Sequence, residues 1–543
     1  MGSPTPSFTG AKPNVAQLET IQDLEVTVTE RSQPFWKLIL EHRRAFMYAL
    51  FANSGALLFG YDVLMQGAIT ALPAFTMYYG SYFGEALILP AMWQGLWSAM
   101  NSLGIMIGAS SNGFLQDKFG RRPMFFVGGV IAAIAETHLD MRKTGGALEF
   151  ASPELGSLEA RRGALLAAKI ILGIGMGILM STCQTYVSEI SSPRLRTILL
   201  GIFPLFVIVG QIMSVSVIFG QVMNFTEMAI KIPFGSQWAF SGLAIITAFI
   251  VPESPSWLIH KNNLAAAENS LKRLHGSRSD VAGFIQDIQR TIEQERSTSI
   301  EFGTVQYSDC FKGSDLRRTR IVALINSLQQ FMGVSLIANS TYFFIMAGMS
   351  STKALAINQI SLGLSILVTL LGWIVLAKVG RRTAIMSGFV AAAILFLTMG
   401  IAGCFHKTTI ATNYIGVSLI LTGFVGGLSV STAYPIVAAE VPSVRLRAKT
   451  LGIGFFINAF VSWIFNFCVP YIYNVDEGNL GGKTGFVFCG TCIVGLVLSW
   501  FEIPETKDVT YVRLNYLFRI GAKTREFGKT NESGNNATAE PAK

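Results

Sequence analysis

One carboxylate stands inside the first long apolar run of this 543-residue chain. It is Asp62, in the stretch LLFGYDVLMQGAIT (57–70), which contains no basic residue. At the centre of a bilayer-spanning helix an Asp disfavours insertion by about 2.5–3.5 kcal/mol, so such acids are rare and are retained for ion or proton pathways. Asp62 is therefore the first candidate for a functional group, and the elements around it decide which function is open to it.

The composition predicts a polytopic membrane protein. Hydrophobic residues make up 51% of the chain and charged residues only 14%, whereas soluble domains carry about 25% charged residues. Apolar stretches of about 17–25 residues, long enough to cross about 30 Å of hydrocarbon as helices, recur along the chain. The sequence predicts an all-α membrane protein with twelve transmembrane helices, at 45–67, 88–114, 123–138, 163–187, 198–222, 237–251, 321–347, 357–377, 384–403, 414–438, 451–473 and 484–503.

The net charge of +9 is concentrated in alternate loops. Loops 117–122, 192–196, 377–382 and 443–449 are rich in Lys and Arg, and the intervening loops are poor in them. The positive-inside rule places the basic loops, and with them both termini, in the cytosol. The lipid bilayer therefore explains the charge better than a nucleic acid does. Cys489 and Cys492 form a C-x-x-C, but it lies in the last apolar span with no His or acid at ligand spacing, so we interpret it as helix packing and expect no metal and no cofactor. No obligate protein partner is expected either.

Three motifs occur twice, at nearly equal spacing. GRR stands at 120–122 and 380–382, an acid is followed five residues later by Arg at 189–194 and 440–445, and PES at 252–254 returns as PET at 504–506. The offsets are 260, 251 and 252 residues. The repeat predicts two six-helix bundles, at 45–251 and 321–503, joined by a cytoplasmic linker with short helices at 252–320 and flanked by cytoplasmic tails at 1–44 and 504–543.

The first half carries about nine more residues than the second between its third and fourth spans. The extra residues fall in 137–163. This segment puts several positive charges on the external side, which the positive-inside rule disfavours. Two interpretations stay open, a genuine external loop and an artefact of gene prediction.

The repeated acids and bases fit a clamp at the cytoplasmic ends of the helices. Arg side chains after the second and eighth spans can pair with acids at the ends of the fourth and tenth spans, and with neighbouring helix C-termini. Such pairs would hold each bundle together on the inner face and break when that face opens. The alternative is ordinary loop charge. The predicted clamp residues are Asp117, Gly120, Arg121, Arg122, Glu189 and Arg194 in the first half and Gly380, Arg381, Arg382, Glu440 and Arg445 in the second.

The combined pattern resembles a known family. The two GRR and acid-to-Arg motifs, with PESPSWL (252–258), LQQFMG (328–333) and PETK (504–507), are similar to those of the sugar porter family of the major facilitator superfamily over about 45–520. STYFF (340–344), AAEVPSVRLRAKT (438–450) and GGKTGFVF (481–488) resemble the fungal α-glucoside porters of the maltose-permease type. The resemblance implies the major facilitator fold, with a sugar site between two bundles that rock in alternating access.

The resemblance also implies a role for Asp62. In similar proton-coupled porters the acid of a first-span GYD carries the proton, and a basic residue of the fourth span is its partner; the matching position here is Lys169. A buried carboxyl has its pKa raised by desolvation and lowered by a nearby cation, so movement of the cation can load and release a proton. Two alternatives stay open: an Asp that only packs in a polar cluster, and a facilitative uniporter.

Sugar recognition needs amides, hydroxyls and aromatic faces. Positions that match the family provide Gln211, Gln329, Gln330, Ser335, Asn339, Tyr434, Asn458 and Trp463. Buried amides can instead simply tie helices together. Ser335 and Asn339 depart from the residues usual in hexose porters, and Phe59 and Ile453 replace an acid and an Arg of many α-glucoside porters, so the substrate is left open. Asn224, in NFT (224–226), lies in a predicted external loop and is a candidate glycan acceptor.

The sequence thus predicts a multi-pass transporter, not an enzyme, in a fungal plasma membrane. Its expected activity is proton-coupled uptake of an α-glucoside, a disaccharide or a related sugar. A facilitative hexose or polyol uniporter and a transporter-like nutrient sensor are the alternatives. We interpret LGIGMGI (172–178) as close helix packing through small residues, because no strand precedes it as in a nucleotide-binding loop.

Overall fold

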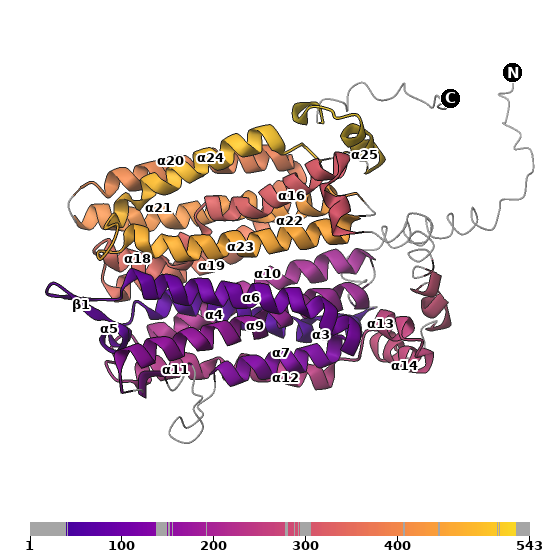
Figure 1. Cartoon of the computed structure of the whole chain (residues 1–543), viewed down its shortest axis with the longest axis horizontal. Helices are drawn as coiled ribbons and strands as arrows, with labels where there is room; N and C mark the ends of the chain where they lie inside the picture. The colour runs from indigo at the N-terminus through magenta and orange to yellow at the C-terminus, as the bar shows by residue number, and fades with distance from the viewer. Residues whose placement is uncertain are drawn as a thin grey trace, which may run out of the picture.

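The computed structural model consists of two helical bundles that lie side by side (Figure 1). It describes residue 40 and residues 42–136, 149, 152–154, 156–191, 193–276, 281–286, 288–290, 293, 306–405, 408–443, 446–507, 509 and 511–527. The chain colours separate the bundles, with the indigo to magenta first half below the orange to yellow second half.

The N-terminal bundle contains six spans. They are α3 with α4 (Arg43–Ala52 and Ser54–Ile69), α6 (Ala91–Phe119), α7 (Arg121–Glu136), α9 (Leu158–Ile190), α10 (Pro193–Phe219) and α11 with α12 (Met228–Ser236 and Trp238–Ile250). After α4 the chain bends by 78° into the short helix α5 (Pro73–Tyr79). An antiparallel hairpin of β1 (Ser81–Phe83) and β2 (Ala86–Ile88) follows, with Ser81 opposite Ile88.

The C-terminal bundle repeats the arrangement. Its spans are α16 with α17 and α18 (Gly313–Phe331, Val334–Ala338 and Ser340–Met346), α19 (Ser351–Lys378), α20 (Arg381–Ala402), α21 with α22 (Thr409–Leu428 and Val430–Glu440), α23 (Arg447–Tyr473) and α24 (Thr484–Glu502). Gly333, with φ of +84°, separates α16 from α17 because glycine adopts this left-handed conformation without a steric penalty. The predicted seventh span is therefore broken into three pieces, and α16 begins at Gly313, seven residues before the predicted end of the linker.

The twelve-span prediction is confirmed at the level of the fold. Eight helical segments of the described residues are long and apolar enough to cross a membrane, and the bent pair from Arg43 to Tyr79 makes a ninth. The remaining spans are shorter or more polar: α7 has 16 residues, α6 carries several amides and hydroxyls, and α16 begins with charged residues. Polar residues on such helices face the bundle interior rather than lipid.

The two ends of the molecule differ. At one end, on the right in Figure 1, lie the linker helices α13 (Pro255–His260) and α14 (Leu264–His275) and the C-terminal helix α25 (Tyr511–Arg519). The hairpin and α5 lie at the opposite end. We call these the linker end and the hairpin end. Both GRR motifs lie at the linker end, since they follow α6 and α19.

Glycines allow unusually close helix packing in the N-terminal bundle. A Cβ at Gly173 would lie 2.4 Å from the carbonyl oxygen of Asn101, and one at Gly177 would lie 2.3 Å from that of Ile105. At Gly175 it would lie 2.9 Å from the backbone of α7. The small-residue interpretation of LGIGMGI is therefore confirmed. The glycines let α9 touch both α6 and α7, and this packing brings the polar residues of α6 and α9 together.

Candidate functional site

The centre of the N-terminal bundle holds a buried ion pair. Nζ of Lys169, on α9, lies 2.6 Å from Oδ1 of Asp62, on α4. The Asp62 side chain is completely buried and that of Lys169 is 2% exposed. The structure thus brings together the two residues predicted for proton coupling, across 107 residues of sequence. Because both charges lie away from water, loss of Lys169 would leave the Asp62 carboxylate uncompensated.

An amide completes the surroundings of Asp62. Nδ2 of Asn101, on α6, donates to Oδ2 of Asp62 at 2.9 Å. Three helices therefore meet at one carboxylate, and the close approach of α9 at Gly173 sets the distance between Asn101 and Lys169. Sequence reasoning missed Asn101, because an amide in an apolar helix carries no motif; only its position on the face of α6 that meets α9 could have suggested it.

Two further carboxyls lie at this site, both missed by sequence reasoning. Oε1 of Glu149, in the connection between α7 and α9, lies 2.5 Å from Nζ of Lys169. Glu136, the last residue of α7, accepts a hydrogen bond from Ser241 of α12 at 2.7 Å and lies within electrostatic range of Glu149, Asp62 and Lys169. Glu149 and Glu136 are both completely buried. Three carboxyls thus surround one ammonium group.

Part of the predicted sugar set forms one hydrogen-bonded group in the C-terminal bundle. Gln330, near the end of α16, donates to Ser462 of α23 at 2.7 Å and accepts from Ser335 of α17 at 2.6 Å. Asn339, at the junction of α17 and α18, donates to the carbonyl of Ser335 at 2.9 Å. The helix break at Gly333 lies between Gln330 and Ser335, so these contacts join α16 to α17 across the break.

The other sugar candidates lie apart from this group. Asn458 of α23 donates to the backbone carbonyl of Asn326 at 2.7 Å, which joins α23 to α16. Trp463 stacks on Phe460, and its indole N–H is buried without an acceptor among the described residues. No hydrogen bond within the described part of the chain joins Gln211, Gln329 or Tyr434 to Gln330. Gln211 belongs to α10, in the opposite bundle.

The predicted clamp of the first half consists of an ion pair at Arg121 and a hydrogen bond from Arg122 to the backbone of α12. Nη2 of Arg121 lies 2.8 Å from Oε1 of Glu189 and 3.3 Å from Oδ1 of Asp117. Arg122 donates from Nε to the carbonyl of Ala248, near the C-terminus of α12, at 2.6 Å. Gly120 has φ of +100°, and a Cβ there would lie 2.4 Å from a carboxylate oxygen of Glu253.

The second half repeats this arrangement at the matching residues. Nη2 of Arg381 lies 3.3 Å from Oε1 of Glu440, and Arg382 donates to the carbonyl of Trp500 at 2.7 Å. A Cβ at Gly380 would lie 2.2 Å from a carboxylate oxygen of Glu505. The side chain of Arg194 and the whole of Arg445 lie outside the described residues.

The acids of PES and PET have a role that sequence reasoning did not assign. Oε1 of Glu253 accepts from the backbone N–H of Arg121 at 2.8 Å, and Oε2 accepts from that of Arg122 at 3.1 Å. Glu505 accepts in the same way from Arg381 at 2.9 Å and Arg382 at 3.2 Å. Each carboxylate caps the N-terminus of the helix that follows GRR, where the helix dipole favours negative charge. GRR and the PES or PET motif both occur once in each half, and this shared repetition was the signal that could have indicated their contact.

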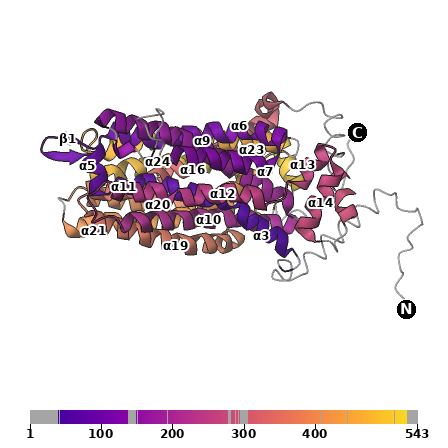
Figure 2. The same ribbon diagram turned by 90° about the horizontal axis from the view of Figure 1, so that it is seen from below.

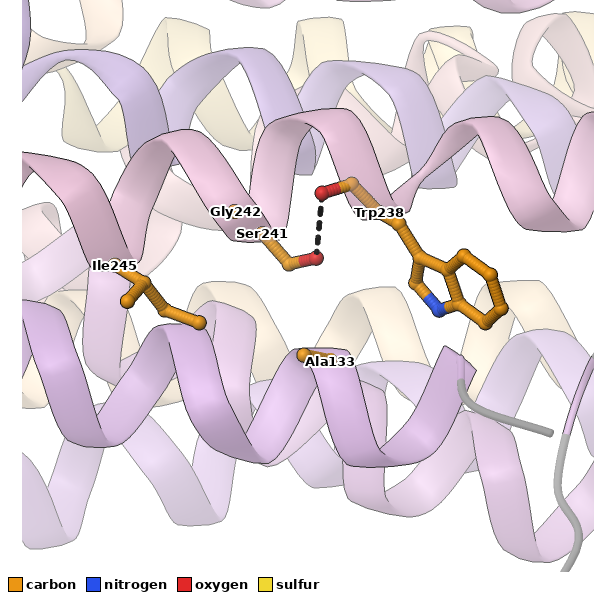
Figure 3. A pocket seen from close by; sticks show the side chains of 5 residues that line it. All are labelled: Ala133, Trp238, Ser241, Gly242 and Ile245. Atoms are coloured by element: carbon orange, nitrogen blue, oxygen red, sulfur yellow. Dashed lines mark hydrogen bonds between the residues drawn. The ribbon is translucent and has the colours of Figure 1, made fainter. Parts of the chain in front are cut away.

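Two grooves on the surface of the N-terminal bundle do not contain the predicted site. One, of about 310 Å³, lies between Ala133 of α7 and residues of α12 (Figure 3). Ser241 and Trp238 line it, and the Ser241 hydroxyl lies 3.3 Å from the Trp238 carbonyl. A second groove, of about 470 Å³, is lined only by apolar side chains of α4, α10 and α12. Both lie on apolar flanks of the N-terminal bundle, where acyl chains of a bilayer would fill them.

The candidate glycan acceptor lies at the hairpin end. Asn224 follows α10 in the connection to α11. Its Oδ1 accepts from the backbone N–H and the hydroxyl of Thr226, at 3.1 and 2.7 Å. The side chain of Asn224 is half-buried.

The structure has two similar six-helix bundles. One holds a buried charge pair, and the other holds a broken helix rich in amides. This combination defines a membrane transporter of the major facilitator type. The chain belongs to the family described as "Sugar (and other) transporter", which matches residues 48–518. It is 32% identical to the MFS transporter fmqE of Aspergillus fumigatus over 92% of each chain. It is 28% identical to the general alpha-glucoside permease of Saccharomyces cerevisiae, over 93% of this chain and 80% of the permease.

Solved structures share the fold. The inward-open form of the xylose transporter XylE from E. coli superposes with a TM-score of 0.69, at 20% identity, over 87% of this chain and 99% of XylE. The proton:xylose symporter XylE bound to 6-bromo-6-deoxy-D-glucose gives 0.64, at 21% identity, over 88% of this chain and all of XylE. The predicted family and fold are thereby confirmed.

Proposed function

We propose that this chain couples the uptake of an α-glucoside or related sugar to inward proton movement across a fungal plasma membrane. The observation that carries the proposal is the buried pair of Asp62 and Lys169, 2.6 Å apart at the centre of a transporter bundle. A buried carboxylate held by one mobile cation can take up a proton when the cation moves away and lose it when the cation returns.

The proton then has a direct effect on helix packing. Protonated Asp62 is neutral and no longer attracts Lys169, so the contact of α4 with α9 weakens. An inward proton across 100 mV contributes about 2.3 kcal/mol. That free energy corresponds to roughly a fifty-fold concentration ratio of sugar.

The sugar class rests on the relatives and on the polar group of the C-terminal bundle. The general alpha-glucoside permease is named for alpha-glucosides. In this chain Gln330, Ser335 and Asn339 present amides and a hydroxyl from the broken seventh span, and Trp463 has an unused buried N–H. Discontinuous helices with exposed backbone and polar side chains are common at transporter substrate sites.

The arrangement of contacts between the bundles supports alternating access. Six hydrogen bonds between described residues join the bundles, and all lie in the half of the molecule at the hairpin end: Leu89–Tyr342, Ala91–Asp476, Gln94–Tyr473, Leu89–Asn474, Ser102–Asn466 and Ser216–Gln359. α6 lies beside α23 in Figure 1 and α10 beside α19 in Figure 2. The bundles are thus joined at the hairpin end. A rocking mechanism requires the bundles to meet first at one end and then at the other.

The membrane orientation follows from charge. Both GRR motifs and the linker helices lie at the linker end, so the positive-inside rule makes this end cytoplasmic. The hairpin end, with Asn224, is then external. We infer that the structure represents a state closed to the outside, in which both predicted clamp pairs, Arg121–Glu189 and Arg381–Glu440, are formed.

Uptake assays in a yeast strain without sugar transporters test the function. We expect uptake of labelled maltose or another member of an α-glucoside panel, and at least a ten-fold loss of accumulation when a protonophore is added. Asp62→Asn should abolish accumulation but retain exchange of labelled for unlabelled sugar, because exchange needs no net proton movement. The proposal is wrong if accumulation persists in Asp62→Asn, or if the protonophore has no effect on the unmodified protein.

A further inference from the structure

We propose that Glu149 is a second proton-binding carboxyl of the coupling site, which shares Lys169 with Asp62 and gives transport its dependence on external pH. This inference deepens the proposed proton coupling and rests on it. Glu149 belongs to the connection between α7 and α9, which is longer than the matching connection between α20 and α21 in the second half of the chain.

The first argument is geometric. Oε1 of Glu149 lies 2.5 Å from the ammonium of Lys169, as close as Oδ1 of Asp62 at 2.6 Å. The backbone around Glu149 is held in place: its N–H donates to the carbonyl of Ala135 at 3.1 Å, and its carbonyl accepts from the Ser152 hydroxyl at 2.7 Å. Ser152 in turn bonds the hydroxyl of Tyr79 on α5. These contacts hold the carboxylate of Glu149 inside the bundle.

The second argument is the charge balance. The groups that face Glu149 are Lys169 of α9, Asp62 and the Tyr61 hydroxyl of α4, Glu136 of α7 and the Tyr79 hydroxyl of α5. Lys231 of α11 is held elsewhere, by Glu154 at 2.5 Å and Glu227 at 3.2 Å. With all three carboxyls ionised, the cluster would bury two uncompensated negative charges. Burial of unpaired charge costs several kcal/mol, so such a cluster takes up protons.

Glu149 is the carboxyl of this set that lies outside the spanning helices. Burial raises its pKa to about 7, although the charge of Lys169 opposes the shift. Its titration range therefore coincides with external pH values near neutrality. Asp62 and Glu136 belong to α4 and α7 themselves.

The proton step is simple in this arrangement. A proton from the external solution binds a carboxylate oxygen of Glu149 and makes it a neutral acid, and Lys169 then belongs to Asp62 alone. When Asp62 later takes up a proton, Glu149 can lose its own and hold the ammonium of Lys169 instead. Lys169 thus always keeps one ionised partner. In a site of Asp62 and Lys169 alone, protonation of Asp62 would leave Lys169 as an unpaired buried cation.

The test is the pH profile of sugar exchange in Glu149→Gln. A group that titrates near 7 goes from about nine-tenths to about one-tenth protonated between pH 6 and 8. We expect exchange by the unmodified protein to change up to about ten-fold over this range, and exchange by Glu149→Gln to change less than about two-fold. Glu154→Gln is the matched control, since Glu154 lies on the same segment but pairs with Lys231 and is 42% exposed. It should keep the profile of the unmodified protein.

The outcomes separate this inference from the proposed function. If Glu149→Gln keeps the full pH dependence, Glu149 is not a proton-binding group, whereas the loss of accumulation in Asp62→Asn would still support proton coupling. If Glu149→Gln does not fold, Glu149→Asp decides: its shorter side chain draws the carboxylate away from Lys169, so a displaced midpoint supports the inference and an unchanged one overturns it.

Discussion

At the scale of the residue, the site consists of one ammonium with more carboxyl groups than it can balance. Lys169→Met leaves Asp62 and Glu149 without a counter-ion, whereas Asp62→Asn leaves Lys169 paired with Glu149. We expect Lys169→Met to reduce the free energy of unfolding by about 3–5 kcal/mol. Asp62→Asn should cost about 1–3 kcal/mol, since one charge-assisted hydrogen bond is lost. Chemical denaturation of the purified proteins measures both, and equal losses would mean that Glu149 does not support Lys169.

The raised pKa of Glu149 also predicts how stability depends on pH. The folded carboxyl holds its proton up to about pH 7, whereas the ordinary value is 4.5. Between these values the folded state binds more protons than the unfolded state, so this group's contribution to stability falls as pH rises from about 4.5 to 7. Thermal unfolding of the unmodified protein and of Glu149→Gln should therefore show a difference in melting temperature that shrinks or reverses as pH rises. If the difference in melting temperature between the two proteins does not change between pH 5 and 7.5, the raised pKa of Glu149 is contradicted.

At the scale of the element, glycines on α9 determine how close the helices of the coupling site come. A Cβ at Gly173 would meet the Asn101 carbonyl at 2.4 Å, so Gly173→Ala must push α6 away from α9. We expect a loss of stability of about 1–3 kcal/mol, together with weaker transport, because Asn101 and Lys169 move apart. Gly163→Ala on the same helix is the control, since nothing lies within 4 Å of its Cβ. Similar effects of both substitutions would contradict this packing argument.

The helices after the GRR motifs are capped by acids from distant segments. Glu253→Gln and Glu505→Gln each replace a carboxylate that accepts the first two backbone N–H groups of a helix, so we expect each to cost about 1–3 kcal/mol and to fray α7 or α20 at its first turn. Hydrogen exchange at 121–124 or 381–384 measures the fraying.

Glu268→Gln is the control for the two caps. Glu268 forms a half-exposed pair with Lys272 on α14, which should contribute less than about 1 kcal/mol. Unchanged protection at both helix N-termini would show that the acids of PES and PET do not cap them.

At the scale of the whole molecule, the two bundles meet most closely near the hairpin end. A Cβ at Gly67 of α4 would lie 2.1 Å from the carbonyl of Ala338 in the opposite bundle. Gly67→Ala should therefore destabilise this closed arrangement and favour the state that is open at the hairpin end. Hydrogen exchange at 86–94 and 471–476 should rise. Gly113→Ala, with nothing within 4 Å of its Cβ, is the control and should leave exchange unchanged. Unchanged protection from hydrogen exchange in Gly67→Ala would contradict the closed contact of the bundles at the hairpin end.

The sequence by itself determined the class of this protein. Apolar length, alternating loop charge and the repeated motifs are local properties of the chain, so the twelve spans and the two halves could be predicted from them. Asp62 stood out because lipid penalises a lone acid wherever the helix lies. Only the position of a residue along its own segment was needed for these inferences.

The tertiary structure decided which distant groups share a site. Glu149, in the connection between α7 and α9, meets Lys169 of α9, and Asn101 of α6 meets Asp62 of α4 in a bundle where glycines bring α6 and α9 together. The break at Gly333 and the caps by Glu253 and Glu505 likewise depend on contacts between segments far apart in the chain. Hydropathy and spacing carry no information on such contacts, because packing of whole helices against one another fixes them.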